Sequence, residues 1–292
     1  MTDNMKIQRD PGHMTKTRRQ IEADLKLVDA VCEIVDARIP VSSRNPDIDA
    51  ICGDKPRMIV LNRMDLADPA ATKKWAEYFR RKGMAVIATD CKSKKGISAF
   101  TPAARLACAE KLERDAKRGM NRPLRVMVVG IPNVGKSTLI NQISGRKSAK
   151  AENRPGVTRG KQWVSVDAGM DLLDTPGILW PKFDDQSVGM NLAYTGAVKD
   201  DILDVETLGC HLMAYLGEHY PDALKAAYKL SALPEREAEK NDIAYGYRLL
   251  EAAGKKRGFL ISGGEVDTER MAKILLDEFR SAKLGRFTLE LP

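Results

Sequence analysis

Short, nearly continuous apolar runs recur in the first part of the chain, and each leads into a polar turn. Such runs are typical of strands that are buried in a sheet. They lie at residues 31–35, 57–61, 85–88 and 124–129. Residues 162–166 and 170–173 predict two further strands that form a hairpin pair.

Stretches with helical spacing separate these runs. The first stretch presents Ile21, Leu25 and Val28 as one apolar stripe. Further helices are predicted at residues 70–82, 98–118 and 136–145. Strands that alternate with helices predict an α/β domain with a mostly parallel sheet flanked by helices.

The strand patterns nearly vanish after about residue 183. Helical patterns follow at residues 186–198, 203–217, 221–230, 235–252 and 267–282. We therefore predict two domains, an α/β domain with an N-terminal arm at residues 1–183 and an all-helical domain at residues 184–292.

Composition then limits the classes of partner. The formal net charge of +8 indicates an anionic partner such as a nucleic acid, although it would also serve general solubility. Aromatic residues make up only 5% of the chain, which argues against a broad aromatic surface for stacking bases.

The cysteines and the apolar content bear on the compartment. The five cysteines are scattered, odd in number and never spaced as C-x-x-C, so we expect reduced thiols and no disulfide or zinc framework. The N-terminus lacks an apolar signal segment, and no apolar run approaches the ~20 residues that span a bilayer. These observations predict a cytoplasmic protein.

A glycine-rich segment, Gly130-Ile-Pro-Asn-Val-Gly-Lys-Ser137, fits the phosphate-binding loop pattern G-x-x-x-x-G-K-[ST]. A buried strand precedes it and a helix follows it, which disfavours a chance match. Lys136 is expected to contact the β- and γ-phosphates, and the Ser137 hydroxyl is expected to bind Mg²⁺. The neighbouring nucleotide-binding candidates are Asn133, Val134, Gly135 and Thr138.

A second motif, Asp174-Thr-Pro-Gly177, stands at the end of a predicted strand. The Asp174 carboxylate is expected to reach Mg²⁺ through water, and the Gly177 N–H is expected to reach the γ-phosphate. The same four residues would also suit a plain turn at the end of a strand. Their position downstream of the glycine-rich loop favours the nucleotide interpretation.

A threonine between these motifs, Thr158, is a candidate switch residue. It lies in Pro155-Gly-Val-Thr158 and could complete the Mg²⁺ shell in the triphosphate state only. The alternative is an ordinary Pro-Gly turn. Basic residues surround it, namely Arg146, Lys147, Lys150, Arg154, Arg159 and Lys161.

The candidate base-reading motif is Asn62-Arg63-Met-Asp65, which follows a buried strand as the N-K-x-D motif of GTPases does. A carboxylate at Asp65 can accept two hydrogen bonds from guanine, and adenine lacks that pair of donors. Discrimination of this kind can reach ~10⁴-fold, so Asp65 disfavours an ATPase. Arg63 replaces the usual lysine, and its long stem and planar head can lie against a base.

A second candidate base loop, Thr89-Asp90-Cys91, follows the next strand, although its residue types are not diagnostic. The base motif thus precedes the phosphate loop, whereas small GTPases have the opposite order. The sequence therefore predicts a circularly permuted P-loop GTPase domain, because strand neighbours rather than chain order define such a site.

With these motifs in hand, the chain resembles the ribosome biogenesis GTPase A (YlqF) family over nearly its whole length. The resemblance is carried by the phosphate loop and by Pro11–Met14, Asp36–Pro46, Asp174–Lys182, Ser262–Gly264 and Lys283–Arg286. It implies a factor that acts late in assembly of the large (50S) ribosomal subunit, that binds 23S rRNA and is released after GTP hydrolysis, and whose GTPase activity the subunit stimulates.

The resemblance also suggests roles for three residues. Ile178 stands where many GTPases carry a water-positioning Gln, so slow intrinsic hydrolysis is expected. His13 is the implied substitute, although it could equally be a surface histidine, and Arg9-Asp10 replaces two aromatic residues usual in the family. Asn133 matches a K⁺ ligand of potassium-stimulated GTPases, although it could be a plain loop residue.

Two alternative functions stay open at this point. One is a signalling GTPase that binds proteins and has no RNA target. The other is a GTP-driven partner of an RNA-modifying enzyme, although the sequence contains no cofactor or modification motif that supports it. The candidate RNA-phosphate contacts in the C-terminal part are Lys255, Lys256, Arg257, Arg280, Lys283 and Arg286.

Overall fold

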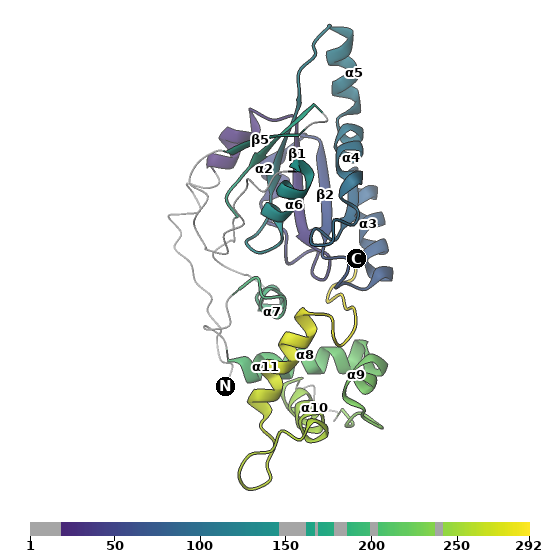
Figure 1. The fold of residues 1–292 in the computed structure, drawn as a ribbon, viewed down its shortest axis with the longest axis vertical. Coiled ribbons are helices and arrows are strands. Elements are labelled where there is room, and N and C mark those ends of the chain that lie inside the picture. The colour runs from purple at the N-terminus through teal and green to yellow at the C-terminus, as the bar shows by residue number, and fades with distance from the viewer. Residues whose placement is uncertain (1–18, 146–161, 167–168, 178–185, 199–203, 237–241) are drawn as a thin grey trace. The chain divides into compact units, whose positions relative to one another are not determined.

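The computed structural model describes residues 19–145, 162–166, 169–177, 186–198, 204–236 and 242–292 (Figure 1). These residues form two compact units. One, the helical unit, is Gly189–Arg286, and the other, the sheet unit, holds the described residues up to Val188 together with Phe287–Pro292. The predicted division at residues 183 and 184 stays a prediction, to which the structure adds that the last six residues group with the sheet.

A six-stranded sheet forms the centre of the sheet unit, with the strand order β3-β2-β1-β4-β6-β5. The strands are β1 (Ala30–Asp36), β2 (Arg57–Asn62), β3 (Ala85–Thr89), β4 (Leu124–Val129), β5 (Gln162–Val166) and β6 (Met170–Asp174). All neighbours pair in parallel except β5 and β6, which are antiparallel. This confirms the predicted α/β class and the predicted hairpin pair.

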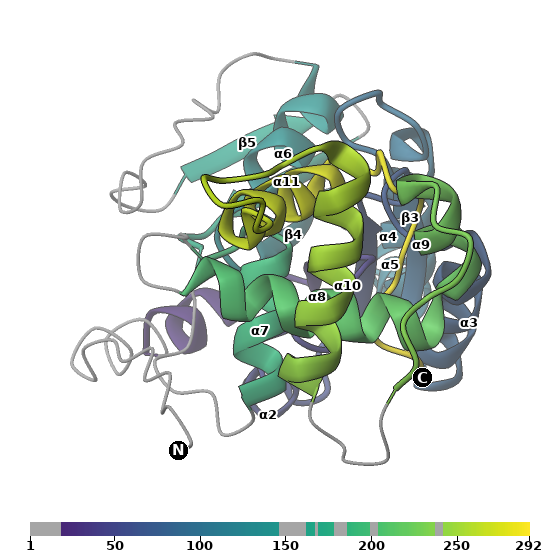
Figure 2. The same cartoon turned by 90° about the horizontal axis from the view of Figure 1, so that it is seen from below.

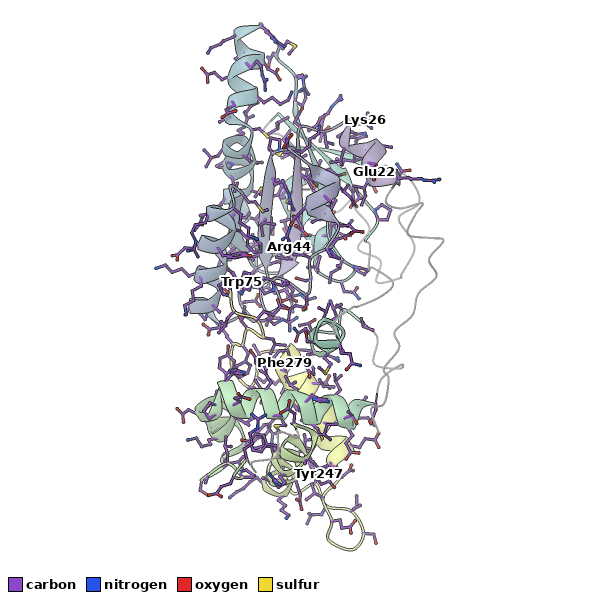
Figure 3. All side chains as sticks on the ribbon, turned by 180° about the vertical axis from the view of Figure 1, so that it is seen from behind. Glu22, Lys26, Arg44, Trp75, Tyr247 and Phe279 are labelled. Carbon is purple, nitrogen blue, oxygen red and sulfur yellow. The ribbon has the colours of Figure 1, made fainter. Side chains whose placement is uncertain are left out.

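Helices cover this sheet (Figure 1). They are a helix at residues 19–25, α2 (Ile48–Cys52), α3 (Pro69–Arg81), α4 (Phe100–Ala107), α5 (Ala109–Lys117) and α6 (Lys136–Ser144). The predicted stripe Ile21, Leu25 and Val28 is buried in one apolar cluster. Trp75 on α3, labelled in Figure 3, is buried in another with Phe79.

The helix predicted at residues 98–118 is divided in the structure. A short 3₁₀ turn (Ile97–Ala99) leads into α4, and Cys108 separates α4 from α5. The Cys108 N–H donates to the Arg105 carbonyl 3.2 Å away, which tightens the chain at this point. α4 buries Phe100 and Ala104, whereas α5 buries only Asp115 and extends beyond the sheet (Figure 1).

The helical unit contains α7–α11, of which α7 begins three residues before the unit itself. They are α7 (Gln186–Tyr194), α8 (Val205–His219), α9 (Pro221–Tyr228), α10 (Asp242–Arg257) and α11 (Thr268–Arg280). The helix predicted at residues 235–252 is found at 242–257, since residues 235–236 are irregular. Gly254 lies inside α10, where it is buried and where a Cβ would lie 2.4 Å from Cγ1 of Val266. Gly258, at φ +69°, follows the last turn as a left-handed cap.

The cysteines and the apolar helices bear on the expected reduced thiols and on the expected absence of a membrane span. All five cysteines are free and buried. Burial raises the pKa of the Cys52 thiol to about 11. No helix among the described ranges is long and apolar enough to cross a bilayer.

α8 and α10 approach each other closely, and Figure 2 shows one lying across the other. A Cβ added at Gly246 of α10 would lie 1.8 Å from the backbone oxygen of Cys210 on α8. Only glycine permits this backbone approach. The packing of the helical unit therefore depends on a missing side chain.

We expect Gly246→Ala to lower the stability of the helical unit by ~1–3 kcal/mol, because overpacking outweighs the better helix propensity of alanine. Thermal unfolding followed by circular dichroism measures this. Lys256→Ala, at an exposed position of the same helix, is the matched control, with an expected change within ~0.5 kcal/mol. Equal melting temperatures for the two variants would contradict the close crossing.

Candidate nucleotide-binding site

The glycine-rich loop joins the end of β4 to the start of α6, and neighbouring atoms require its glycines. A Cβ at Gly130 would lie 2.7 Å from Cγ2 of Ile34 on β1. Gly135 has φ +103°, and a Cβ there would lie 2.3 Å from the Asn62 side-chain nitrogen. Asn133 also has a positive φ, of 62°. The loop thus curls back over the strand ends, and its backbone precedes the N-terminus of α6, as in loops that bind phosphate.

Two predicted site residues meet beside this loop. Lys136, the first residue of α6, forms an ion pair with Asp174 at the end of β6, and both side chains are buried. The parallel register that pairs Val128 with Asp174 brings this carboxylate alongside the loop. Ser137 and Thr138 follow Lys136 on α6 and are half-buried. The geometry therefore brings together the lysine predicted to contact phosphates and the carboxylate predicted to reach Mg²⁺.

The segment after Asp174 returns to the loop. The Thr175 hydroxyl donates to the Val128 carbonyl over 2.8 Å, which anchors the segment to β4. A Cβ at Gly177 would lie 3.2 Å from the Pro132 nitrogen, so Gly177 lies against the glycine-rich loop. This is where a γ-phosphate contact was predicted for Gly177.

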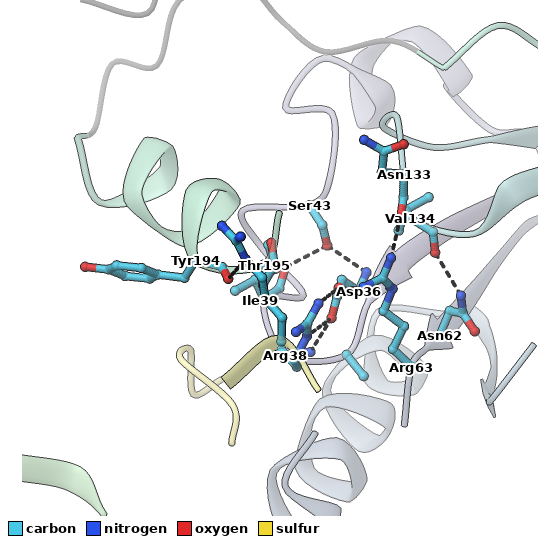
Figure 4. A network of polar contacts seen from close by, with 12 residues as sticks. Asp36, Arg38, Ile39, Ser43, Asn62, Arg63, Asn133, Val134, Tyr194 and Thr195 are labelled. Atoms are coloured by element: carbon cyan, nitrogen blue, oxygen red, sulfur yellow. Dashed lines mark hydrogen bonds and ion pairs between the residues drawn. The ribbon is translucent and has the colours of Figure 1, made fainter. Parts of the chain in front are cut away.

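Asn62 connects the candidate base-reading motif to two other loops, and Figure 4 shows its bond to one of them, the phosphate loop. Its Nδ2 donates to the Val134 carbonyl over 2.8 Å. Its Oδ1 accepts from the Thr89 hydroxyl and from the Cys91 N–H, each at 3.1 Å. Asn62 is buried, so its amide acts as a structural junction between the base motif, the phosphate loop and the second base loop.

Arg63 forms a second connection to the phosphate loop (Figure 4). Its backbone is left-handed at φ 62°, and its NH2 donates to the Asn133 carbonyl over 2.7 Å. Its Nε lies 3.7 Å from Oδ2 of Asp36 at the end of β1. Asp65, two residues on, is half-buried. The arginine that departs from the usual lysine is therefore held in place from two directions.

The Asp36 carboxylate is bound to a buried arginine. Oδ1 accepts from the Arg38 backbone N–H and from its Nε, both at 3.0 Å, and Oδ2 accepts from its NH2 at 2.7 Å. Burial alone would raise the pKa of Asp36, but the charges of Arg38 and Arg63 and the Arg38 hydrogen bonds lower it overall. Asp36 is thus held as an anion beside Arg63.

Sequence reasoning assigned no role to Asp36 or Arg38, which entered only as part of a family motif. A signal for Asp36 exists in the strand pattern. It ends β1 as Asn62 ends the neighbouring β2, and the two residues pair in register. A polar residue at the carboxyl end of a parallel strand is a candidate for the site formed there.

The second base loop is ordered by its own side chain. The Asp90 carboxylate accepts from the backbone N–H groups of Lys92 and Ser93 at 2.9 and 3.1 Å. Burial alone would raise the pKa of Asp90, but a hydrogen bond from the Ser93 side chain, these two backbone bonds and the charge of Lys92 lower it overall. The Cys91 N–H of the same loop donates to Asn62, so the predicted loop lies beside the base motif.

Three predicted functional residues, His13, Thr158 and Ile178, lie outside the described residues, as do the basic residues at 146–161. Their roles stay predictions. In the described part of the chain, no group of three or more His, Cys, Asp or Glu residues could hold a metal ion alone. The Ser137 hydroxyl and the Asp174 carboxylate supply the oxygen ligands that Mg²⁺ prefers, and Mg²⁺ commonly takes its other ligands from phosphates and water. These residues therefore fit Mg²⁺ bound together with a nucleotide.

We expect Asn62→Ala to weaken GDP binding by about tenfold or more, since each buried group left unpaired costs ~1–3 kcal/mol. Isothermal titration calorimetry with GDP measures the effect. Lys73→Ala on the exposed face of α3 is the control and should bind as the unchanged chain does. Normal GDP affinity in Asn62→Ala would show that the three-loop junction does not support the site.

Comparison with known proteins finds related GTPases. A family model described as 50S ribosome-binding GTPase matches residues 125–223. Ribosome biogenesis GTPase A of Priestia megaterium is 46% identical over 99% of this chain and 98% of its own length. Its counterpart in Bacillus cereus is also 46% identical, over 99% and 95%.

A solved structure is similar as well. The GDP-bound structure of TM YlqF superposes with a TM-score of 0.61 at 28% identity, over 94% of this chain and 99% of that one. The similarity therefore extends over both the sheet unit and the helical unit. A relative that is 46% identical over nearly the whole length shows that this chain belongs to the ribosome biogenesis GTPase A family of GTPases.

Proposed function

We propose that this chain is a GTP-hydrolysing assembly factor for the large ribosomal subunit, which binds 23S rRNA of the precursor in the GTP state and leaves after hydrolysis. The proposal is supported by the glycine-rich loop that lies beside the Lys136–Asp174 ion pair, in a chain whose relatives are named for ribosome biogenesis. The family model description, 50S ribosome-binding GTPase, names the same target. Such a role belongs in the cytoplasm.

In this proposal several residues share the binding of GTP, all of them described by the structure except Thr158. Asp65 reads guanine, and Arg63 lies against the base. The glycine-rich loop with Lys136 holds the phosphates, and Gly177 contacts the γ-phosphate. Mg²⁺, held by Ser137 and Thr158 and reached by Asp174 through water, would neutralise phosphate charge. A K⁺ ion at Asn133 stays a prediction.

Thr158 belongs to the segment that responds to the nucleotide state, and His13 promotes hydrolysis. GTP would order the segments around Thr158 and Gly177, and the second of these leads toward the helical unit, so nucleotide state can bias that unit. Ile178 cannot orient water, so intrinsic turnover would be slow. Docking on the precursor would bring His13 to the γ-phosphate, where it would position the attacking water.

The helical unit offers basic residues for rRNA phosphates. Lys255 and Lys256 are exposed in the last turn of α10, and Lys283 and Arg286 are exposed beyond α11. Arg280 has another task, since it donates to the Ala193 and Tyr194 carbonyls at the end of α7, at 2.8 and 3.1 Å. These bonds hold the Arg280 side chain at the end of α7, which makes Arg280 a weaker candidate for contacting phosphates than the other four residues.

We expect the chain to sediment with purified 50S subunits in a non-hydrolysable GTP analogue and to stay in the supernatant in GDP. Binding should fall steeply between ~50 and ~200 mM salt, because rRNA contacts release counterions. Binding that is insensitive to salt would favour the alternative, a signalling GTPase that recognises proteins. No difference between the two nucleotides would contradict the timing switch.

We expect His13→Ala to bind GTP normally and to lose the stimulation of hydrolysis by 50S subunits, by ~10²-fold or more. Phosphate release, measured with and without subunits, reports this. His219→Ala is the control, because His219 is exposed at the end of α8. Full stimulation in His13→Ala would refute the role of the N-terminal arm.

A further inference from the structure

The last residues of the chain lie between two loops of the nucleotide site. These loops follow β1 and β2, at residues 37–43 and 63–68, and the second carries Arg63 and Asp65. The chain enters this place directly from Arg286, the last residue of the helical unit. Phe287, Thr288 and Leu289 are buried, with at most 7% of each residue exposed. This is the burial of a packed element and not of a loose end.

Backbone and hydroxyl groups of this segment bond to both loops. On the β2 side, the Phe287 N–H donates to the Leu66 carbonyl over 3.3 Å, and the Thr288 hydroxyl accepts from the Asp68 N–H over 3.2 Å. On the β1 side, the Leu289 N–H donates to the Arg38 carbonyl over 2.8 Å. The segment therefore bridges the loop that carries Asp65 and the loop that carries Arg38.

Glu290 makes the strongest of these connections. Its carboxylate accepts from the Val41 N–H over 2.6 Å, from the Ser42 N–H over 3.0 Å and from the Ser42 hydroxyl. Hydrogen bonds to an ionised acceptor are about twice as strong as neutral ones. The Glu290 carbonyl also accepts from the indole N–H of Trp75 over 2.8 Å, which ties the segment to α3.

The β1 loop reaches the nucleotide site through Arg38. Arg38 is fully buried and bonds the Asp36 carboxylate, which lies beside Arg63. Arg63 in turn donates to the Asn133 carbonyl of the phosphate loop. An unbroken series of hydrogen bonds and ion pairs thus leads from the C-terminal segment to the base motif and the phosphate loop.

We propose that residues 287–290 form a C-terminal clasp that holds the base-reading segment 62–65 in position, with Glu290 as its positioning residue. Glu290 acts through the loop after β1 and through Trp75 of α3, and not on the nucleotide itself. The inference rests on the nucleotide-binding part of the proposed function.

The test compares GDP with inosine diphosphate, which lacks the guanine 2-amino group and so forms one bond fewer with Asp65. Both nucleotides are titrated calorimetrically against the full-length chain. We expect Glu290→Ala to weaken GDP binding by about tenfold, within the range usual for coupling between sites. Inosine diphosphate should lose less, so the preference for GDP should shrink. A merely structural role would weaken both nucleotides equally.

Two variants serve as references. Leu291→Ala, next in the chain and 63% exposed, should bind both nucleotides as the unchanged chain does. Glu290→Gln keeps one acceptor oxygen and should recover part of the GDP affinity. If Glu290→Ala is unfolded by circular dichroism at the assay temperature, Trp75→Phe decides, because it removes the indole N–H and keeps an aromatic ring. It should then show the reduced preference for GDP.

Unchanged GDP affinity, or an equal loss for both nucleotides, would overturn the clasp and leave the proposed function intact. A chain that without any substitution fails to prefer GDP to inosine diphosphate would overturn the base-reading assignment and the clasp together.

Discussion

The in-register parallel pairing of β1, β2 and β3 is the constraint on which the nucleotide site depends. It brings Asp36, Asn62 and Thr89 to the same edge of the sheet, one at the end of each strand. The Asn62 amide then uses its donor and its acceptor to connect three loops that are distant in sequence. A slip of one residue in any of these strands would move the polar end residue away from its partners.

Much of this arrangement could be predicted from the sequence, since buried strands of a parallel sheet are short apolar runs and a phosphate loop has fixed spacing. The strand positions and the place of the phosphate loop between β4 and α6 follow from that information, whereas the ion pair between Lys136 and Asp174 was found only in the structure. The division of the long helix at Cys108 did not. Helical spacing continues through Cys108 in the sequence. The difference between the two helices is in three dimensions, since α4 packs on the sheet and α5 extends beyond it.

The rest of the site depends on contacts that leave no local pattern. Glu290 bonds Val41 across 249 positions of the chain, and nothing near either residue indicates the partnership. The Asp36–Arg63 contact could not be predicted from the sequence either, because a charged residue at the end of a strand is equally compatible with a solvated turn. The departure at Arg63 was visible in the sequence, but its support by Asn133 and Asp36 required three-dimensional distances.

The grouping of residues 287–292 with the sheet makes the helical unit an insertion rather than an appendage. A fragment that stops after α7 would lose the helices and would also leave the loops after β1 and β2 without their partners. The indole N–H of Trp75 would have to find water or remain unpaired. An independent GTPase module from this protein would therefore need a linker that joins residue 188 to residue 287, so that the C-terminal segment is retained.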